Sequence, residues 1–183
     1  MAIDRTVNLD ILYNCAIIAR MTDYIKQYDK ATQEVLKLAE KIDRDFMPLY
    51  DLDYSLVDIV KVLRNKYKNP AFRKKYVGDM PFNGFVPYTK GFCALTTICI
   101  YNLYGGDSIW EPSAIKLGTW EHAPVVFLRD RMSGRAFDPT GDQFAPLVVP
   151  YDVATPINKR VKDMKTPNKD AFIREIVSEL QRK

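Results

Sequence analysis

The sequence predicts an α+β fold, with helices first, then a small antiparallel sheet and a closing helix. Apolar residues recur at spacings of three and four up to about residue 77, which is the helical period. An irregular loop rich in Gly and Pro follows at residues 78–91, and short strand-like segments come after it. Runs of helices followed by runs of strands are typical of α+β proteins.

The first part of the chain is predicted to form three helices. One runs from Leu9 to Leu38, as a single helix or as two with a bend, and ends at Met47-Pro48 because a residue before proline is pushed out of helical geometry. The second is capped by Asp53 or Ser55 and extends to about Tyr67. A short third helix is expected at residues 71–76.

The second part begins with a strongly apolar helix from Cys93 to about Tyr104, which Gly105-Gly106 terminates. A turn at residues 130–134 makes a hairpin of two of the strands that follow. Strands are predicted at residues 114–117, 123–128, 135–137 and 147–149, and an amphipathic helix at residues 169–180. We therefore expect a helical lobe at residues 1–77 and a core at residues 78–183 that includes the last helix, together in one compact unit.

Composition narrows the classes of function. A formal charge of +4 on 183 residues is too small to demand nucleic acid or anionic lipid as a partner. Three cysteines cannot form a fully paired disulfide framework. The sequence shows neither a signal-peptide pattern nor an apolar stretch of roughly eighteen residues. We expect a cytoplasmic protein with no membrane partner, and export by a route without a signal peptide stays open.

No cofactor or metal is expected. The sequence contains no phosphate-binding loop and no dinucleotide fingerprint. Cys93, Cys99 and His122 lack the paired spacing of zinc ligands.

Three residues are candidates for nucleophilic catalysis. Cys93 stands at the first turn of a helix, where backbone N–H groups lower a thiol's pKa and offer donors to an oxyanion. His122, the single histidine, opens one hairpin strand and Asp138 closes the next. A thiol, an imidazole base and a carboxylate that orients the imidazole are the groups such chemistry needs.

The distance between His122 and Asp138 depends on the hairpin register. If Arg129 pairs with Arg135, both side chains fall on the same face of the sheet, about four positions apart along the ladder. A bulge or a tighter turn near Asp130 brings them opposite each other.

Four segments resemble the core of transglutaminase-like cysteine enzymes, which belong to the papain-like superfamily. They are G-F-C-A-L-T-T at residues 91–97, S-A-I-K-L-G at 113–118, E-H-A-P-V-V-F at 121–127 and F-D-P-T at 137–140. The resemblance implies a papain-like core in which a buried helix packs on a small antiparallel sheet. It implies Cys93 as nucleophile, His122 as base and Asp138 as orienting acid, although Asp142 or Glu121 are alternatives for the acid.

The function implied is that of a thiol-dependent hydrolase or acyltransferase: a cysteine peptidase, deamidase or transamidase that acts on an amide or thioester of a protein or peptide through an acyl-enzyme. Pro124 stands where the family usually has an aromatic residue. Candidates for the oxyanion hole are Tyr88, Asn83 and Gln143. Trp110 and Trp120 either line a substrate cleft or pack in the core.

The alternative is a non-catalytic binding module with the same fold, which recognises protein or nucleic acid through a basic helical face. Its basic residues are interleaved with aromatic ones, as in proteins that grip phosphates and stack bases. A solvated helix face explains the same pattern, and we favour it because acids elsewhere nearly cancel the charge. The basic residues are Lys61, Arg64, Lys66, Lys68, Arg73, Lys74 and Lys75.

Overall fold

The computed structural model describes residues 5–78, 87–117, 124–157 and 166–182, with side chains described from Met21 onward. The described residues form five α-helices and a four-stranded antiparallel sheet, so the α+β class is confirmed. The helices are α1 (Arg5–Phe46), α2 (Leu56–Tyr67), α3 (Pro70–Val77), α4 (Cys93–Leu103) and α5 (Lys169–Leu180). The strands are β1 (Trp110–Ile115), β2 (Val125–Asp130), β3 (Ala136–Phe137) and β4 (Thr155–Pro156).

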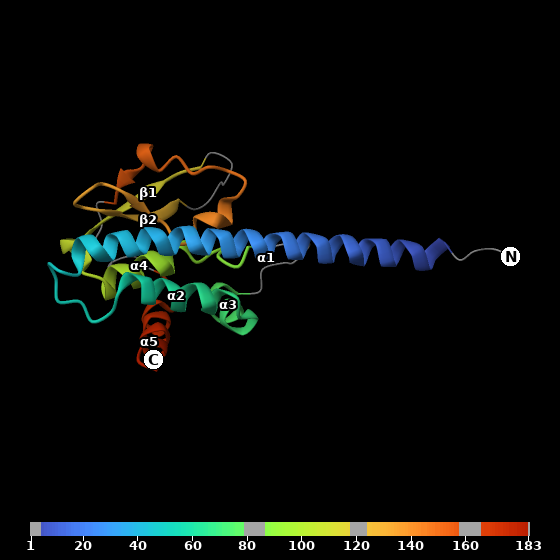
Figure 1. The fold of residues 1–183 in the computed structure, drawn as a ribbon, viewed down its shortest axis with the longest axis horizontal. Helices are drawn as coiled ribbons and strands as arrows, with labels where there is room; N and C mark the ends of the chain where they lie inside the picture. The colour runs from blue at the N-terminus through green and yellow to red at the C-terminus, as the bar shows by residue number, and fades with distance from the viewer. Residues whose placement is uncertain (1–4, 79–86, 118–123, 158–165, 183) are drawn as a thin grey trace.

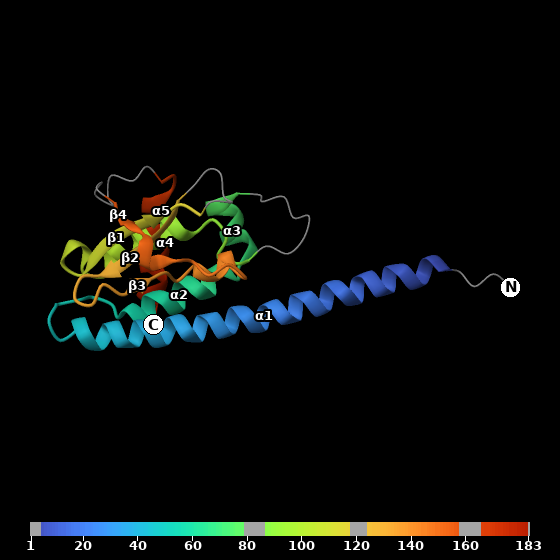
Figure 2. The same cartoon turned by 90° about the horizontal axis from the view of Figure 1, so that it is seen from above.

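Helix α1 is one continuous helix of 42 residues, about 63 Å long at 1.5 Å per residue. It ends at Phe46, just before Met47-Pro48, as the pattern predicts. Its C-terminal half packs on the body through Tyr28, Ala39 and Ile42. Its N-terminal half projects beyond the other elements (Figure 2).

The starts of α2 and α3 are fixed by side-chain caps. Ser55, one of the two predicted caps, accepts a hydrogen bond from the Asp58 N–H. The carboxylate of Asp43, on α1, accepts the N–H groups of Leu56 and Val57 at 2.8 and 3.0 Å, which ties the two helices together. Helix α3 begins at Pro70 after its cap Asn69.

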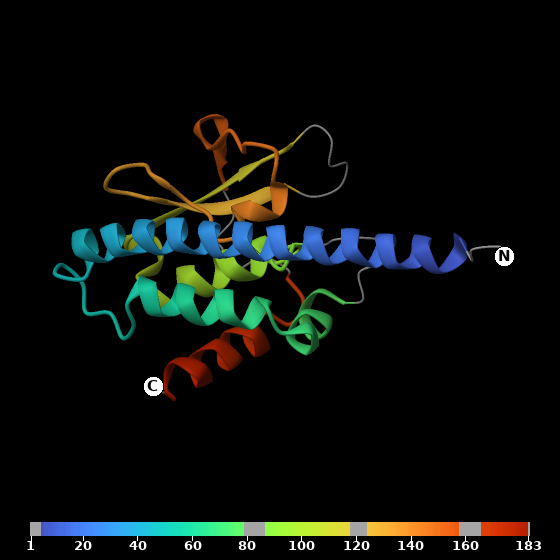
Figure 3. The ribbon, with the colours of Figure 1, turned by 45° about the vertical axis from the view of Figure 1, so that its right-hand side comes forward.

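Helix α4 lies in the middle of the molecule, with the sheet on one side and α2 and α5 on the other (Figures 1 and 3). Its buried residues include Leu95, Ile98 and Ile100. Helix α5 adds Phe172 and Ile176 to the same core. This core combines side chains from both sides of the expected lobe boundary at residue 77.

The sheet has the order β3-β2-β1-β4. Strand β1 begins at Trp110, four residues before the predicted start, although it contains Pro112. The strand predicted at residues 147–149 is absent, because Pro146 and Pro150 flank the segment and β4 instead pairs with the free edge of β1. Val149 is nevertheless buried, against a second cluster on the outer face of the sheet.

The β2–β3 hairpin has a register that differs by one residue from the expected pairing. Leu128 lies opposite Phe137 and Arg129 opposite Ala136. The Asp130 carboxylate accepts the Ser133 N–H at 2.6 Å, and Gly134 adopts a positive φ of 68°. These contacts close a loop that holds one residue more than the expected one between its paired strand residues.

Candidate functional site

Cys93 is the first residue of α4, and a single residue of β2 holds it in place. The backbone N–H of Val126 donates a hydrogen bond to the Cys93 thiol. One turn further along α4, the Thr97 hydroxyl donates to the Val126 carbonyl at 3.1 Å. Because β3 pairs only with Leu128 and Arg129 in the described ladder, Val126 lies beyond the β3 pairing. Two side chains of α4 thus bind its backbone and pin the start of the helix to the sheet.

The Cys93 thiol is partly buried, and its pKa is raised. Burial is the largest cause, and the negative charge of Asp138 adds to it. Backbone hydrogen bonds at Val126, Ala94 and Cys93 itself lower the pKa, which is the expected effect of a helix N-terminus. They do not outweigh burial. The thiol therefore needs a further group to become a thiolate near neutral pH.

Asp138 follows β3 directly and is held by neighbouring side chains. The Thr140 N–H and hydroxyl donate to Oδ1 at 2.9 and 2.7 Å. The Tyr151 hydroxyl donates to Oδ2 at 2.9 Å. Burial nevertheless raises the pKa of Asp138, against these bonds and together with the charge of Asp142. An ionised carboxylate has about four acceptor positions, so roughly one remains open for another donor.

His122, Trp120, Asn83 and Glu121 lie outside the described residues. The observed register overturns the expected argument that His122 and Asp138 share a face, because residues of unlike parity now lie opposite each other in β2 and β3. Continuation of this register by one residue would set Phe127 opposite Asp138. A straight continuation of β2 would carry position 122 about 16 Å further along the ladder, at about 3.3 Å per residue. Contact between the two side chains therefore depends on the course of residues 118–123.

Gln143, an oxyanion candidate, clamps two loops of the site together. Its Nε2 donates to the Thr140 carbonyl at 3.0 Å, and its Oε1 accepts the Gly91 N–H at 3.2 Å. Gly91 lies two residues before Cys93. Both ends of the amide are thus bonded within the protein, and they join the turn after Asp138 to the loop before Cys93.

Tyr88, another oxyanion candidate, packs against α1. Its ring makes edge contacts with Tyr24 and Tyr28, each with a centroid distance of 5.0 Å, and the Arg73 guanidinium lies 4.9 Å from its centre. The Tyr88 N–H donates to the Tyr24 hydroxyl. The ring therefore belongs to an aromatic cluster between α1 and the loop before α4.

Trp110 belongs to the core and does not line a cleft. Its side chain is fully buried, and its indole N–H donates to the Tyr104 carbonyl at 2.7 Å. The ring stacks on Phe137 with a centroid distance of 5.7 Å. Cys99 is likewise a core residue, fully buried, with a thiol pKa raised by desolvation.

Sequence reasoning missed the role of Arg64, which it grouped with the basic face. Arg64 is 1% exposed, and its Nη1 contacts the Asp142 carboxylate at 2.6 Å. A signal existed, because Arg64 follows Val60 by four residues and precedes Tyr67 by three, and so lies on the apolar face of α2.

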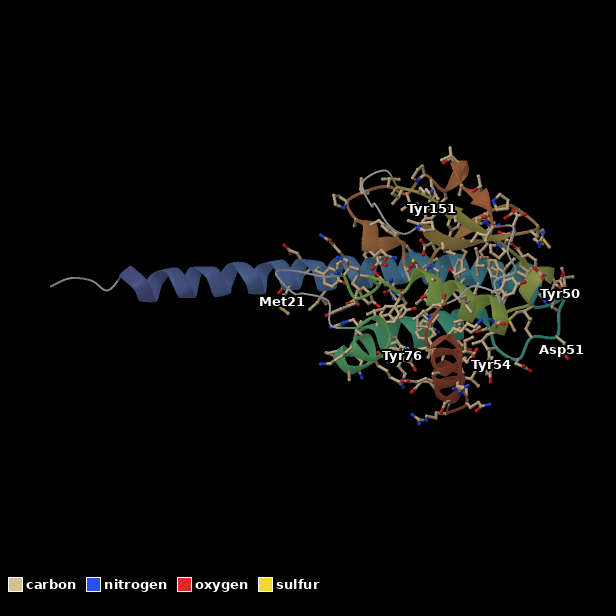
Figure 4. All side chains as sticks on the ribbon, turned by 180° about the vertical axis from the view of Figure 1, so that it is seen from behind. Met21, Tyr50, Asp51, Tyr54, Tyr76 and Tyr151 are labelled. Atoms are coloured by element: carbon tan, nitrogen blue, oxygen red, sulfur yellow. The ribbon has the colours of Figure 1, made fainter. Side chains whose placement is uncertain are left out.

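Three other basic residues of this face, Lys66, Lys68 and Lys75, form ion pairs within the protein. Lys66 lies 2.9 Å from Glu179, and Lys75 lies 2.7 Å from Glu175, both on α5. Lys68 pairs with Asp29 of α1 at 3.0 Å. These basic side chains therefore join the α2–α3 region to α1 and α5. In the view of Figure 4, Tyr76, on α3, is drawn below α1, and Tyr151, which reaches Asp138, is drawn above it.

Within the described ranges, no cluster of three or more His, Cys, Asp or Glu side chains has the geometry to hold a metal ion. None of the helices in this part of the chain is long and apolar enough to cross a membrane. Comparisons with protein-family models, curated proteins and solved structures found nothing that matches this chain.

Proposed function

We propose that the chain is a thiol-dependent hydrolase or acyltransferase with a transglutaminase-like, papain-like core, which acts on an amide or thioester of a protein or peptide. The observation that carries the proposal is the electrostatic coupling of Cys93 to Asp138, whose flanking loops Gln143 joins. The thiol at the first residue of α4 lies close enough to the carboxylate after β3 for the charge of Asp138 to raise the thiol pKa. Both residues belong to the family-like segments of the sequence.

The proposed reaction passes through an acyl-enzyme. His122 takes the proton from the Cys93 sulfur, and the thiolate attacks the carbonyl carbon of the substrate. Backbone N–H groups at the start of α4 stabilise the oxyanion. His122 then gives the proton to the departing amine or thiolate, and water or a second amine attacks the thioester to release the acyl group. Asp138 orients the imidazole through its open acceptor position.

The electrostatics of the site support a histidine between the two groups. A buried thiol beside a carboxylate is disfavoured as a thiolate, because like charges repel and burial penalises charge. An imidazolium between the thiolate and the carboxylate offsets both effects. His122 is the one histidine in the sequence, so the proposal assigns this position to it.

Alkylation by iodoacetamide tests the proposal. We expect Cys93 to react near neutral pH faster in the native protein than in the urea-unfolded chain, although burial alone would slow it. We expect His122→Ala to remove this advantage, while the slow labelling of buried Cys99 stays as it was. Native labelling of Cys93 no faster than in unfolded protein, with or without His122, would contradict the proposal.

The second candidate is a non-catalytic binding module with the same fold. The raised pKa of Cys93 favours it, because a protonated thiol is a weak nucleophile. Its nucleic-acid version has little support, since Arg64, Lys66 and Lys75 pair with acids of the protein itself. Retention on a phosphate-bearing column that falls steeply with salt would revive that version.

A further inference from the structure

We propose that Arg64 is a positioning residue of the Cys93 site, which holds the turn after Asp138 and so fixes the carboxylate that the proposed function pairs with His122. The inference rests on the proposed function. Arg64 lies on α2, in the helical part of the chain, and its side chain contacts the turn after Asp138.

Arg64 binds both ends of the turn with one planar group. Its Nη1 donates to the Pro139 carbonyl at 2.9 Å and to Asp142 Oδ1 at 2.6 Å. Pro139 follows Asp138 directly, and Asp142 closes the turn. A guanidinium presents its donors in a fixed fork, so it fixes the spacing of these two acceptors.

The guanidinium is itself fixed by α1. Its Nε donates to the Thr32 hydroxyl at 2.9 Å and its Nη2 to the Tyr28 carbonyl at 3.0 Å. The Tyr28 ring stacks below it, with 3.9 Å between the guanidinium carbon and the ring centre. Burial raises the pKa of Tyr24, and the positive charge of Arg64 opposes that rise. Arg64 therefore cannot move without disturbing its contacts on α1.

Hydrogen bonds connect the turn that Arg64 holds to Asp138 and to the loop before Cys93. Thr140, inside the turn, gives two hydrogen bonds to Asp138. Gln143, next to Asp142, bonds the Thr140 carbonyl and the Gly91 N–H before Cys93. If the Arg64–Asp142 pair served stability alone, apolar side chains would be expected at these two positions. Replacing a buried ion pair by well-packed apolar side chains is often neutral or stabilising.

The single histidine offers a direct readout. We expect NMR titration of the imidazole to show that Asp138→Asn lowers the pKa of His122 by about one unit or more, since a nearby carboxylate favours the charged ring. Arg64→Lys keeps the positive charge but loses the fork, and we expect it to lower the same pKa by roughly half a unit. Lys66→Met, which breaks ion pairs to α5 without touching the turn, is the matched control and should leave the pKa unchanged.

The double variant separates positioning from a purely structural role. If Arg64 acts through Asp138, Arg64→Lys has no further effect on the pKa of His122 in an Asp138→Asn background. A fall in melting temperature with an unchanged pKa in Arg64→Lys would overturn the inference and leave the proposed function standing. No effect of Asp138→Asn on the imidazole would overturn both. If Arg64→Lys does not fold, Thr32→Val, which removes the hydroxyl that accepts the Arg64 Nε–H and changes no charge, replaces it in the same cycle and is held to the same outcomes.

Discussion

The pKa of the Cys93 thiol, at the start of α4, is raised by burial and further by the charge of Asp138, the residue that follows β3. Each is fixed by its own contacts: the thiol by the Val126 N–H, the carboxylate by Thr140 and Tyr151. A carboxylate near a partly buried thiol disfavours the thiolate unless a cation stands between them. This relationship is the physical reason to look for an imidazolium at the site.

Loss of the Thr140 hydroxyl should destabilise the protein. Thr140 is fully buried, and its hydroxyl lies 2.7 Å from Asp138 Oδ1. We expect Thr140→Val to lower the free energy of unfolding by about 1.5–3 kcal/mol at neutral pH, the usual range for a hydrogen bond to a charged group. Thr140→Ser keeps the hydroxyl and is the control. In urea titrations the loss should shrink as pH falls through the pKa of Asp138 in the folded protein, which burial raises above the ordinary Asp value of about 3.9. Equal losses in the Val and Ser variants would speak against this role.

Gly141 leaves room for the Tyr151 hydroxyl. A Cβ at position 141 would lie 2.6 Å from that oxygen and 3.6 Å from Asp138 Oδ2. We expect Gly141→Ala to push the hydroxyl off Asp138 and to cost about 1–3 kcal/mol, as overpacking usually does. In a Tyr151→Phe background the clash is absent, so the same substitution should cost much less. Additive effects on the melting temperature would show that the two positions are independent.

Replacement of Trp110 tests its place in the core. Trp110→Phe removes the indole N–H that bonds the Tyr104 carbonyl and leaves a smaller ring on Phe137. We expect a loss of about 1–3 kcal/mol in unfolding free energy, with the rate of Cys93 alkylation unchanged in the folded protein. A large change in that rate at unchanged stability would place Trp110 in the cleft after all.

Docking of α5 should depend on pH through Glu175. Burial alone would raise its pKa, but bonds from Lys75 and Tyr76 and the charge of Lys66 outweigh burial and lower it. The folded protein thus binds this proton less tightly than the unfolded chain, so the stabilisation is complete above the ordinary Glu pKa of about 4.3 and is lost as pH falls through the lowered value.

We therefore expect Glu175→Gln to lower stability at pH 7 by about 1 kcal/mol or less, since solvent and salt screen the contacts. The difference should vanish in acid. Glu34→Gln, which breaks an exposed contact of 4.0 Å with Lys30, should change little at either pH. A constant difference across the pH range would contradict the assignment.

The helices could be predicted because their signals are local. Ser55 as a cap, the apolar face of α2 and the Gly105 stop are all visible in neighbouring residues. Strand β4 was not predictable, because it is two exposed residues whose pairing depends on the edge of β1. The predicted hairpin register was wrong by one residue. The observed register depends on the turn contact between Asp130 and Ser133, which the pattern of apolar residues does not indicate.

The candidate site was predictable only in part. Position at a helix start singled out Cys93, and the Asp-Pro-Thr run singled out Asp138. Nothing local reveals that Arg64 pairs with Asp142, 78 residues away, or that Gln143 bonds Gly91. Such contacts are set by tertiary packing, which periodicity does not encode.

The most direct test of the central claim is the ultraviolet titration of the Cys93 thiolate, taken as the difference between the unmodified protein and its Cys93→Ala variant. We predict a midpoint clearly below the ordinary thiol value of about 8.5, which rises above that value when His122 is replaced by Ala. The same midpoint at or above about 8.5 with and without His122 would contradict the claim that an imidazole ionises this sulfur.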